Sequence, residues 1–228
     1  MADMYELAQS MWEYEAMGVS EGFSMIAGVD EAGRGPLAGP VVSAAVILPA
    51  DFSVAGVTDS KQLTPLKRSL LYEEIYRCAL SIGIGIVDPV EIDRINILQA
   101  SLTAMAMAVE NLNPLPDLLL VDGNVLIAPC RFNHCPENLK QKTIVGGDAK
   151  SISISAASIV AKVTRDSIMT GYHLDYPEFG FPSHKGYATK AHLAAIAQFG
   201  CCPIHRRSFK GAGGEMFKQQ NLFPHDPL

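Results

Sequence analysis

The most constraining feature of the sequence is a short apolar run that leads directly into two adjacent acidic residues. Residues 26–29 have the composition of a buried strand end, Asp30 and Glu31 follow at once, and a Gly-Arg-Gly turn occupies residues 33–35. Carboxylates are costly to remove from water unless a cation compensates their charge. The pattern therefore predicts a sheet whose strand end holds a divalent metal, with a phosphate or sugar bound beside it.

Two short motifs in the same region fit known signatures but lack the structural context that those signatures require. Residues 33–38 fit the G-x-G-x-x-A dinucleotide fingerprint, which must open a helix. Prolines interrupt this segment, and residues 41–48 have the pattern of a strand, so a nucleotide cofactor is only weakly indicated. Residues 18–22 fit the G-x-S-x-G elbow, which needs a strand before it and a helix after it. Here the order is reversed, and we discard the elbow.

Length and composition indicate a globular protein of one domain with at most a small appendage. None of the apolar runs in the 228 residues approaches the length of a membrane span, and residues 1–24 contain no Lys or Arg. We therefore expect a cytoplasmic monomer without a membrane anchor. The five cysteines are irregularly spaced and predict free thiols. Zinc sites built on Cys130, His134 and Cys135, or on the pair at 201–202 with His205, lack paired C-x-x-C spacing and are not favoured.

The distribution of charge differs between the two halves of the chain. Residues 1–139 carry a net charge of −11 and residues 140–228 a net charge of +5, within an overall −6. A basic C-terminal part beside an acidic N-terminal part can form a local phosphate-binding surface. The alternative is a chance asymmetry of solvated faces.

The spacing of apolar residues predicts an α/β protein with a mixed sheet. We expect strands at 23–29, 41–48, 81–87, 118–121 and 141–145, and helices at 3–16, 64–79, 95–111, 152–165 and 189–199. The early strands are close enough in sequence to pair antiparallel, whereas helices separate the later ones. The apolar runs within these strands predict helices on both faces of the sheet.

Four acidic residues share a position at a predicted strand end or just before a helix, namely Asp30, Glu31, Asp122 and Asp148. Ligands of open α/β sheets gather at the carboxyl ends of the strands, so neighbouring strands would bring these side chains together. Four carboxylates in contact could not all ionise without cations. Two Mg²⁺ or Mn²⁺ ions would satisfy them and would suit in-line cleavage of a phosphodiester. Taken singly, each Asp could instead be a turn residue.

Six segments occur in an order that carries a family resemblance. They are VDEAGRGPLAGP at 29–40, DSKQL at 59–63, LLLVDG at 118–123, GDAKSISISAASIVAKVTRD at 147–166, HKGY at 184–187 and HRRSF at 205–209. The series resembles the bacterial ribonuclease HII family over roughly residues 22–210. The resemblance implies a ribonuclease H-like mixed sheet flanked by helices, with a small helical C-terminal extension. It also implies cleavage of the RNA strand of RNA–DNA hybrids and of single ribonucleotides embedded in duplex DNA, as in ribonucleotide excision repair.

With this resemblance, the chain divides into an N-terminal helix (1–24), a catalytic domain (25–165), a helical extension (166–210) and a flexible tail (211–228). The four acids coincide with the metal-binding acids of the family. The ribonucleotide-reading turn of the family coincides with Gly33, Arg34 and Gly35, and its junction-sensing tyrosine with Tyr187. Candidate phosphate contacts are Lys61, Lys185, Arg206 and Arg207. For Lys162 and Arg165 a solvated position on a helix is an equal alternative, and for His184 and His205 a structural hydrogen bond is favoured over general acid catalysis.

Other functions remain as alternatives. A non-catalytic nucleic-acid-binding module would carry basic and aromatic residues without a cluster of carboxylates. Another metal nuclease of this fold, such as ribonuclease HIII or a junction resolvase, is less favoured because of the position of Asp148 and because we see no N-terminal platform domain. Residues 219–223 (QQNLF) follow a glycine-rich spacer and resemble peptides that dock on bacterial sliding clamps. The alternative is that the apolar residues of this tail pack back onto the domain.

Overall fold

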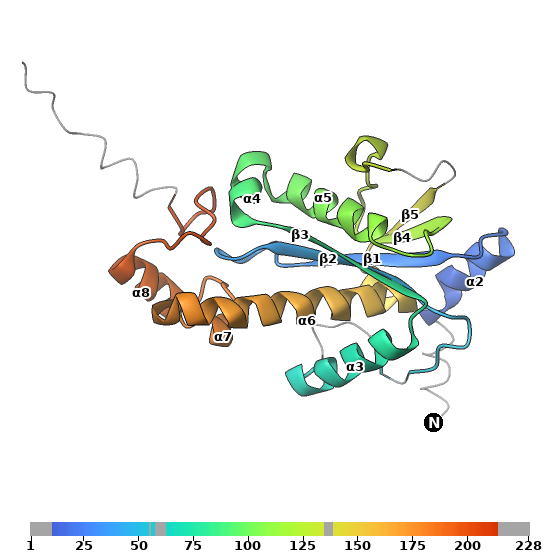
Figure 1. Cartoon of the computed structure of the whole chain (residues 1–228), viewed down its shortest axis with the longest axis horizontal. Helices are drawn as coiled ribbons and strands as arrows, with labels where there is room; N and C mark the ends of the chain where they lie inside the picture. Colours follow the sequence, from blue (N-terminus) through green and yellow to red (C-terminus); the bar gives the residue numbers. More distant parts are fainter. Residues whose placement is uncertain (1–10, 55, 58–62, 135–138, 214–228) are drawn as a thin grey trace, which may run out of the picture.

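The computed structural model describes residues 11–54, 56–57, 63–134 and 139–213, and its centre is a mixed sheet between two layers of helices (Figure 1). The strands lie in the order β3-β2-β1-β4-β5. Their bounds are Ile26–Ala32 (β1), Val41–Ile47 (β2), Ser81–Val87 (β3), Leu118–Asp122 (β4) and Lys140–Ile144 (β5). Antiparallel pairing joins β1, β2 and β3, whereas β1, β4 and β5 run parallel. The predicted mixed α/β sheet is confirmed.

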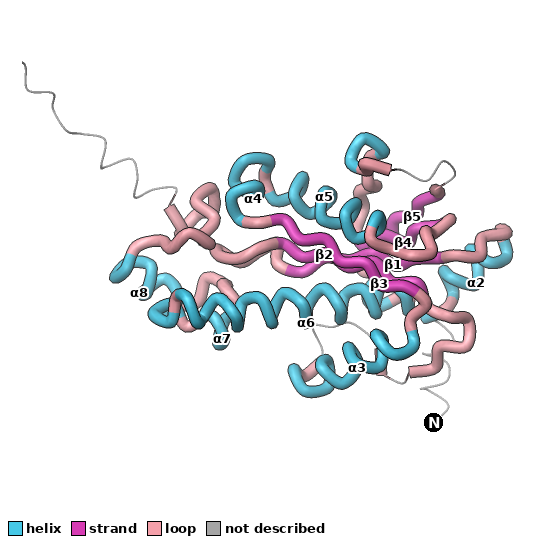
Figure 2. Tube along the Cα trace, in the orientation of Figure 1, coloured by secondary structure: helices cyan, strands magenta, loops and turns pink. Residues whose placement is uncertain are grey.

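Helices cover both faces of this sheet, as its apolar strands predict (Figure 2). The α-helices are α2 (Glu13–Ser20), α3 (Pro65–Cys78), α4 (Pro89–Ile95), α5 (Ile97–Glu110), α6 (Ile152–Asp175), α7 (Phe181–His184) and α8 (Lys190–Phe199). Short 3-10 helices lie at Pro129–Arg131 (η1), Gly147–Ala149 (η2) and Pro177–Phe179 (η3). One face of the sheet packs against α5, and the other packs against α6, with α3 outside α6 (Figure 1).

Glycines in the strands bring the two helical layers into close contact with the sheet. A Cβ atom at Gly28 of β1 would lie 2.1 Å from the backbone of Ser153 in α6. A Cβ atom at Gly85 of β3 would lie 1.9 Å from the carbonyl oxygen of Ala104 in α5. Since real Cβ atoms do not approach backbone this closely, both positions need glycine. The first turn of α6 is therefore seated directly on β1, two residues before Asp30.

Tertiary pairing shifts several predicted boundaries. The first strand continues beyond its apolar run to Ala32, which pairs with Val42, so Asp30 and Glu31 lie within β1 rather than after it. The helix predicted at 95–111 is α5, which begins at Ile97 because Asn96 has a φ of 68° and caps it through its side chain, whereas the preceding helix α4 was not predicted. Near the N-terminus the described helix is Glu13–Ser20, later than the predicted 3–16, of which residues 3–10 lie outside the described part.

The C-terminal region is helical, as expected, and it is tied to the central sheet. The helix α6 runs without interruption to Asp175, so the predicted boundary between residues 165 and 166 falls inside it. Beyond it, η3, α7 and α8 surround a small apolar cluster that includes Phe179 and Phe181. An isolated bridge between Ala38 and His205 joins this region to the segment that follows β1. Among the described helices, none has both the length and the apolar character of a membrane span.

Candidate active site

The acidic site lies where the parallel pairing between β1 and β4 ends. Their register pairs Val29 with Val121, so Asp30 and Asp122 occupy the next positions at the same edge of the sheet. Asp30 is buried, with 4% of its surface exposed, whereas Asp122 and Glu31 are half-buried. The predicted meeting of the acids of the first and fourth strands is therefore a consequence of parallel pairing.

The electrostatics of this edge are those of crowded negative charge. Burial raises the pKa of Asp30 well above its ordinary value, and the charges of Glu31 and Asp122 raise it further. Hydrogen bonds oppose this effect, since the carboxylate of Asp30 is bonded to the Ser158 side chain and to the amide of Glu31 at 2.7 Å. Such a site favours a cation, because positive charge would relieve both the burial of Asp30 and the repulsion from its neighbours.

The fourth predicted acid, Asp148, lies in the short helix η2 just before α6. It is buried, and its neighbour Gly147 donates its amide hydrogen to the carboxylate of Asp122 at 2.7 Å. A left-handed Gly146, with a φ of 66°, makes the turn from β5 into η2. The loop that carries Asp148 is therefore fixed to the end of β4.

The carboxylate oxygens of the four acids are suitable ligands for a hard divalent cation, although the four side chains do not converge on a single position. Among the described residues, no three Asp, Glu, His or Cys side chains form a metal-binding group. One oxygen of Glu31 pairs with Arg34 at 3.2 Å, and one oxygen of Asp122 accepts from Gly147. Mg²⁺ keeps several waters and commonly takes only one or two carboxylates together with substrate phosphates. The buried carboxylate of Asp30, flanked by Glu31 and Asp122, matches that requirement.

The Gly-Arg-Gly turn leaves β1 directly beyond the acids. Gly33 has a φ of 98°, a conformation that favours glycine. Arg34 is exposed and turns its guanidinium back to Glu31, so a cation already lies at the rim of the acidic edge. The side chain of Tyr187, which is 45% exposed, lies beside Gly35, where an added Cβ would be 3.7 Å from the ring. The turn and the tyrosine, far apart in sequence, thus form one surface.

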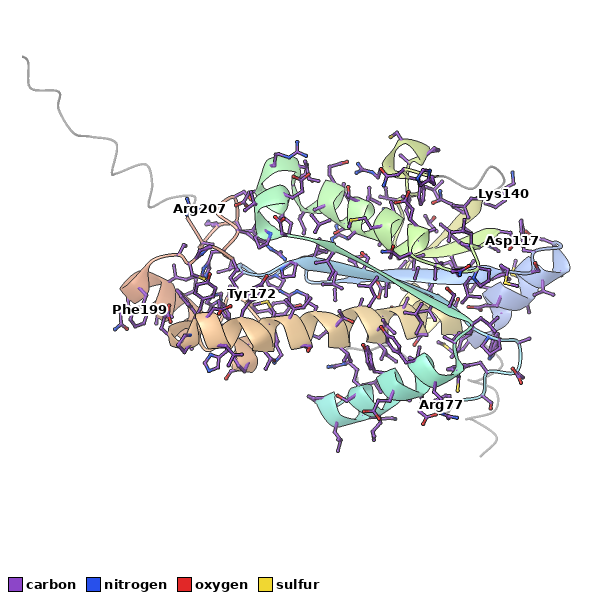
Figure 3. The ribbon with its side chains drawn as sticks, viewed as in Figure 1. Arg77, Asp117, Lys140, Tyr172, Phe199 and Arg207 are labelled. Carbon is purple, nitrogen blue, oxygen red and sulfur yellow. The ribbon has the colours of Figure 1, made fainter. Side chains whose placement is uncertain are left out.

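The basic residues predicted to contact phosphate have different locations. Arg207 is exposed and lies at the opposite end of the molecule from Asp117 and Lys140, which mark the beginnings of β4 and β5 (Figure 3). Lys185 is half-buried, and its ammonium group donates to the carbonyl of Pro182 at 2.7 Å. Lys61 lies outside the described residues.

The prediction that Arg206 contacts phosphate is wrong, because this side chain is fully buried. Its guanidinium donates to the carbonyl oxygens of Gly39, Arg34 and Gly33 at 2.9, 3.0 and 2.6 Å. Arg165, for which a solvated helix position was an alternative, is also fully buried. Arg165 lies on the buried face of α6 with Ala161 and Met169, four residues away on either side, and that spacing was the available signal.

The histidines have structural hydrogen bonds, in agreement with the favoured interpretation. His184 lies 2.8 Å from the carbonyl of Phe179 and accepts from the amide of Gly186. His205 is buried, and its ring lies 3.0 Å from that of His192. The sulfur of Cys202 lies 3.1 Å from His205, and no metal-binding group of three occurs there among the described residues.

Comparison with known proteins agrees with this geometry. The family model for ribonuclease HII matches residues 27–212. The ribonuclease HII of Geobacter metallireducens is 55% identical over 203 residues, covering 89% of this chain and 92% of that protein. The ribonuclease H2 structure from Pyrococcus horikoshii OT3 aligns with a TM-score of 0.69 and 30% identity over 86% of this chain and 100% of that chain. The structure of a PCNA:RNase HII complex from Archaeoglobus fulgidus aligns with a TM-score of 0.65 and 27% identity over 82% of this chain and 96% of that chain. The chain therefore belongs to the ribonuclease HII family, endoribonucleases that cleave the RNA of RNA–DNA hybrids.

Proposed function

We propose that this enzyme also nicks duplex DNA on the 5′ side of a single embedded ribonucleotide, leaving a 3′-hydroxyl and a 5′-phosphate. The observation that carries the proposal is the contact between two parts of the chain. The glycine turn that follows the acids lies against Tyr187, so a surface able to read a sugar adjoins the acidic edge. An activity of this kind belongs to ribonucleotide excision repair, and we place it in a monomeric cytoplasmic enzyme.

Two divalent ions, Mg²⁺ or Mn²⁺, would be held by the carboxylates of Asp30, Glu31, Asp122 and Asp148. When bound, such ions neutralise charge on the phosphate and make a water molecule a better nucleophile. The high pKa of Asp30, which burial and neighbouring charge produce, supports this assignment, because a cation would offset both causes.

The turn at residues 33–35 reads the ribose in this proposal. Glycine lets backbone amides and carbonyls approach the 2′-hydroxyl, which distinguishes RNA from DNA. Arg34, exposed at the rim and already turned toward Glu31, braces the scissile phosphate through its paired N–H groups. Hydrolysis then forms a bond from the water oxygen to phosphorus and breaks the bond from phosphorus to the 3′-oxygen of the preceding deoxynucleotide. That oxygen takes a proton, and the ribonucleotide keeps its 5′-phosphate.

The exposed ring of Tyr187 packs against the sugar at the junction between RNA and DNA. Lys61, Lys185 and Arg207 serve as phosphate contacts along the duplex. The tail residues 219–223, which lie outside the described part of the chain, tether the enzyme to a sliding clamp. The related Archaeoglobus enzyme, solved as a complex with PCNA, supports this part of the proposal.

End-labelled duplexes of one sequence test the function. The labelled strand is all DNA in the first duplex, carries a single ribonucleotide in the second and is all RNA in the third, and its partner strand is DNA in each. We expect Mg²⁺-dependent cleavage of the last two, with the single nick mapping 5′ to the ribonucleotide and leaving an end that a DNA polymerase extends. Chelation with EDTA should stop both reactions. A nick on the 3′ side, or equal cleavage of the all-DNA duplex, would overturn the proposal.

A further inference from the structure

The two largest fully buried side chains among the described residues are arginines, Arg165 and Arg206. Arg206 binds the carbonyls of the turn, as described above, and Arg165 binds the segment that follows the turn and the segment before Tyr187. The guanidinium of Arg165 donates to the carbonyls of Pro40 and Ala38 at 2.9 and 3.0 Å and to that of Lys185 at 3.1 Å. One arginine therefore holds the turn, and the other joins the segment after the turn to the segment that carries Tyr187.

Both arginines lie in the interior of the protein. Within the described part of the chain, neither forms an ion pair with a carboxylate. Burial lowers the pKa of Arg165 to about 10 and that of Arg206 to about 9, so both remain protonated at neutral pH. The charge of Arg165 also lowers the pKa of Arg206, which means that the two cations repel each other. Burying two cations of this kind costs free energy of folding. A contribution to stability alone therefore does not account for their presence in the interior.

The hydrogen bonds of Arg206 determine how the peptide groups of the turn are oriented. In a trans peptide the carbonyl and the N–H point in opposite directions. Since the carbonyls of Gly33 and Arg34 point at the buried guanidinium, the N–H groups of Arg34 and Gly35 point away from it. The arginine thus prevents the two peptides from flipping and keeps two donors available to a ligand.

Arg165 and nearby backbone bonds fix the distance between the turn and the tyrosine. Its guanidinium lies directly under the turn, where a Cβ at Gly33 would be 2.1 Å from its Nε atom. The amide of Leu37 also donates to the carbonyl of Gly186 at 2.8 Å, next to Tyr187. These contacts fix the position of the Tyr187 ring relative to the outward N–H groups of Arg34 and Gly35.

We propose that Arg165 and Arg206 are positioning residues for recognition of the ribose, acting from inside the protein without contacting the substrate. The proposal rests on the function proposed above for the turn at residues 33–35. Lysine in either place would keep the charge but would lose the planar fork that serves three carbonyls at once. The turn would then sample flipped peptides, and discrimination between ribose and deoxyribose would fall.

The test compares binding of two duplexes that differ only by one 2′-hydroxyl. Fluorescence anisotropy gives the ratio of their dissociation constants for the full-length enzyme in EDTA, and steady-state kinetics in Mg²⁺ give kcat and KM. The binding ratio is the dissociation constant of the all-DNA duplex divided by that of the single-ribonucleotide duplex. We expect Arg165→Lys and Arg206→Lys to lower this ratio at least tenfold, and to lower kcat/KM for the single-ribonucleotide duplex by a similar factor. Binding of the all-DNA duplex should change less than twofold.

A matched control is Arg131→Lys on the other side of the sheet, where a partly buried guanidinium binds the carbonyl of Gln99 and the hydroxyl of Thr103. All variants are assayed at least 15 °C below their own melting temperatures. An unchanged binding ratio in both Lys variants, or the same decrease in Arg131→Lys, would overturn the proposal. If the unmodified enzyme does not distinguish the duplexes, the proposed function of the turn fails instead.

Hydrogen exchange on the unmodified enzyme keeps the proposal testable even if both variants fail to fold. The amides of Arg34 and Gly35 should exchange rapidly in the free enzyme and become protected by the ribonucleotide duplex but not by the all-DNA duplex. Strong protection of both amides in the free enzyme would show that they point inward, and would contradict the proposed orientation.

Discussion

At the scale of single residues, the site is organised around a carboxylate that is costly to ionise. Replacing Asp30 by Asn removes a charge that burial and two neighbouring acids oppose. We expect Asp30→Asn to lose more than 99% of the cleavage activity, while its melting temperature in metal-free buffer stays equal or rises. Asp117→Asn, at the opposite end of β4, is the control that should keep activity. Near-normal cleavage by Asp30→Asn would refute the ligand assignment.

The exposed ring of Tyr187 should matter most where RNA meets DNA. We expect Tyr187→Ala to reduce kcat/KM on the single-ribonucleotide duplex several times more than on a long hybrid, because packing against the junction sugar is lost. Tyr187→Phe should keep kcat/KM on both substrates close to that of the unmodified enzyme, since in this proposal the ring and not the hydroxyl makes the contact. Parallel kinetics on the two substrates measure this, and equal losses on both would argue against junction sensing.

The buried pair of His205 and His192 makes stability depend on pH. Burial and the neighbouring ring lower the pKa of His205 to about 4, so it is neutral in the folded protein at pH 5, whereas in the unfolded chain it protonates below about 6.5. The folded state then binds fewer protons, and stability is lost as pH falls from about 6.5 to about 4, by at most roughly 3 kcal/mol. Urea unfolding at pH 7 and pH 5 should show a smaller decrease for His205→Gln than for the exposed-site control His134→Gln. Equal decreases would contradict the assignment.

Site residues could be predicted from the sequence where their surroundings are formed by neighbouring positions in the chain, and not where distant positions form them. Asp30, Glu31 and the glycine turn are contiguous, so the sequence itself shows charge following a buried strand. Arg206 was misassigned because an arginine in a basic motif has the same sequence signature whether it faces solvent or the interior. Its burial is decided by carbonyls more than 160 positions away, at Gly33, Arg34 and Gly39.

At the scale of elements, the long helix α6 begins at a junction with the N-terminal helix α2. The buried carboxylate of Glu15 accepts from the hydroxyls of Ser151 and Ser153 at 2.6 Å and from the amide of Ser153 at 3.0 Å. These bonds satisfy free donors at the helix N-terminus, where negative charge is also favoured by the dipole. Residues 136 positions apart thereby complete a helix cap.

We expect Glu15→Ala to lower the free energy of unfolding by about 2–3 kcal/mol, because it leaves buried donors without an acceptor. Glu15→Gln should cost less, since its carbonyl can still accept. Glu13→Ala, on the exposed side of the same helix, is the control and should change stability by less than about 0.5 kcal/mol. Denaturant titration compares the three, and an effect of Glu15→Ala no larger than the control would contradict the capping role.

The existence of most elements was predictable, whereas several of their ends were not. The strand β3 and the helix α3, with Thr64 as its cap and Pro65 in its first turn, follow the predicted pattern closely. The split between α4 and α5 depends on the left-handed backbone of Asn96, which apolar periodicity does not register. The acids fall within β1 because pairing with β2 continues to Ala32, and such pairing is a tertiary effect.

At the scale of the whole molecule, the remaining prediction concerns the tail at residues 219–223. If it is a tether, a labelled peptide of residues 214–228 should bind the cognate sliding clamp with a micromolar dissociation constant, as a peptide that orders on binding does. Leu222 and Phe223 would be the buried anchors, and replacing both with Ala should abolish binding. Lys218→Ala, just outside the motif, is the control. The absence of binding would favour packing of the tail on the domain.

The uninterrupted helix α6 connects the acidic edge of the sheet to the glycine turn that is proposed to read the ribose. Ser158 of this helix forms a hydrogen bond with Asp30, and Arg165, two turns later in the same helix, lies beside Gly33 of the glycine turn. Seven residues at 1.5 Å each separate the two supports by about 10 Å along the axis. In the proposed function, this one continuous helix would hold the recognised sugar and the cleaved phosphate at a fixed spacing, and the nick would fall at a constant offset from that sugar.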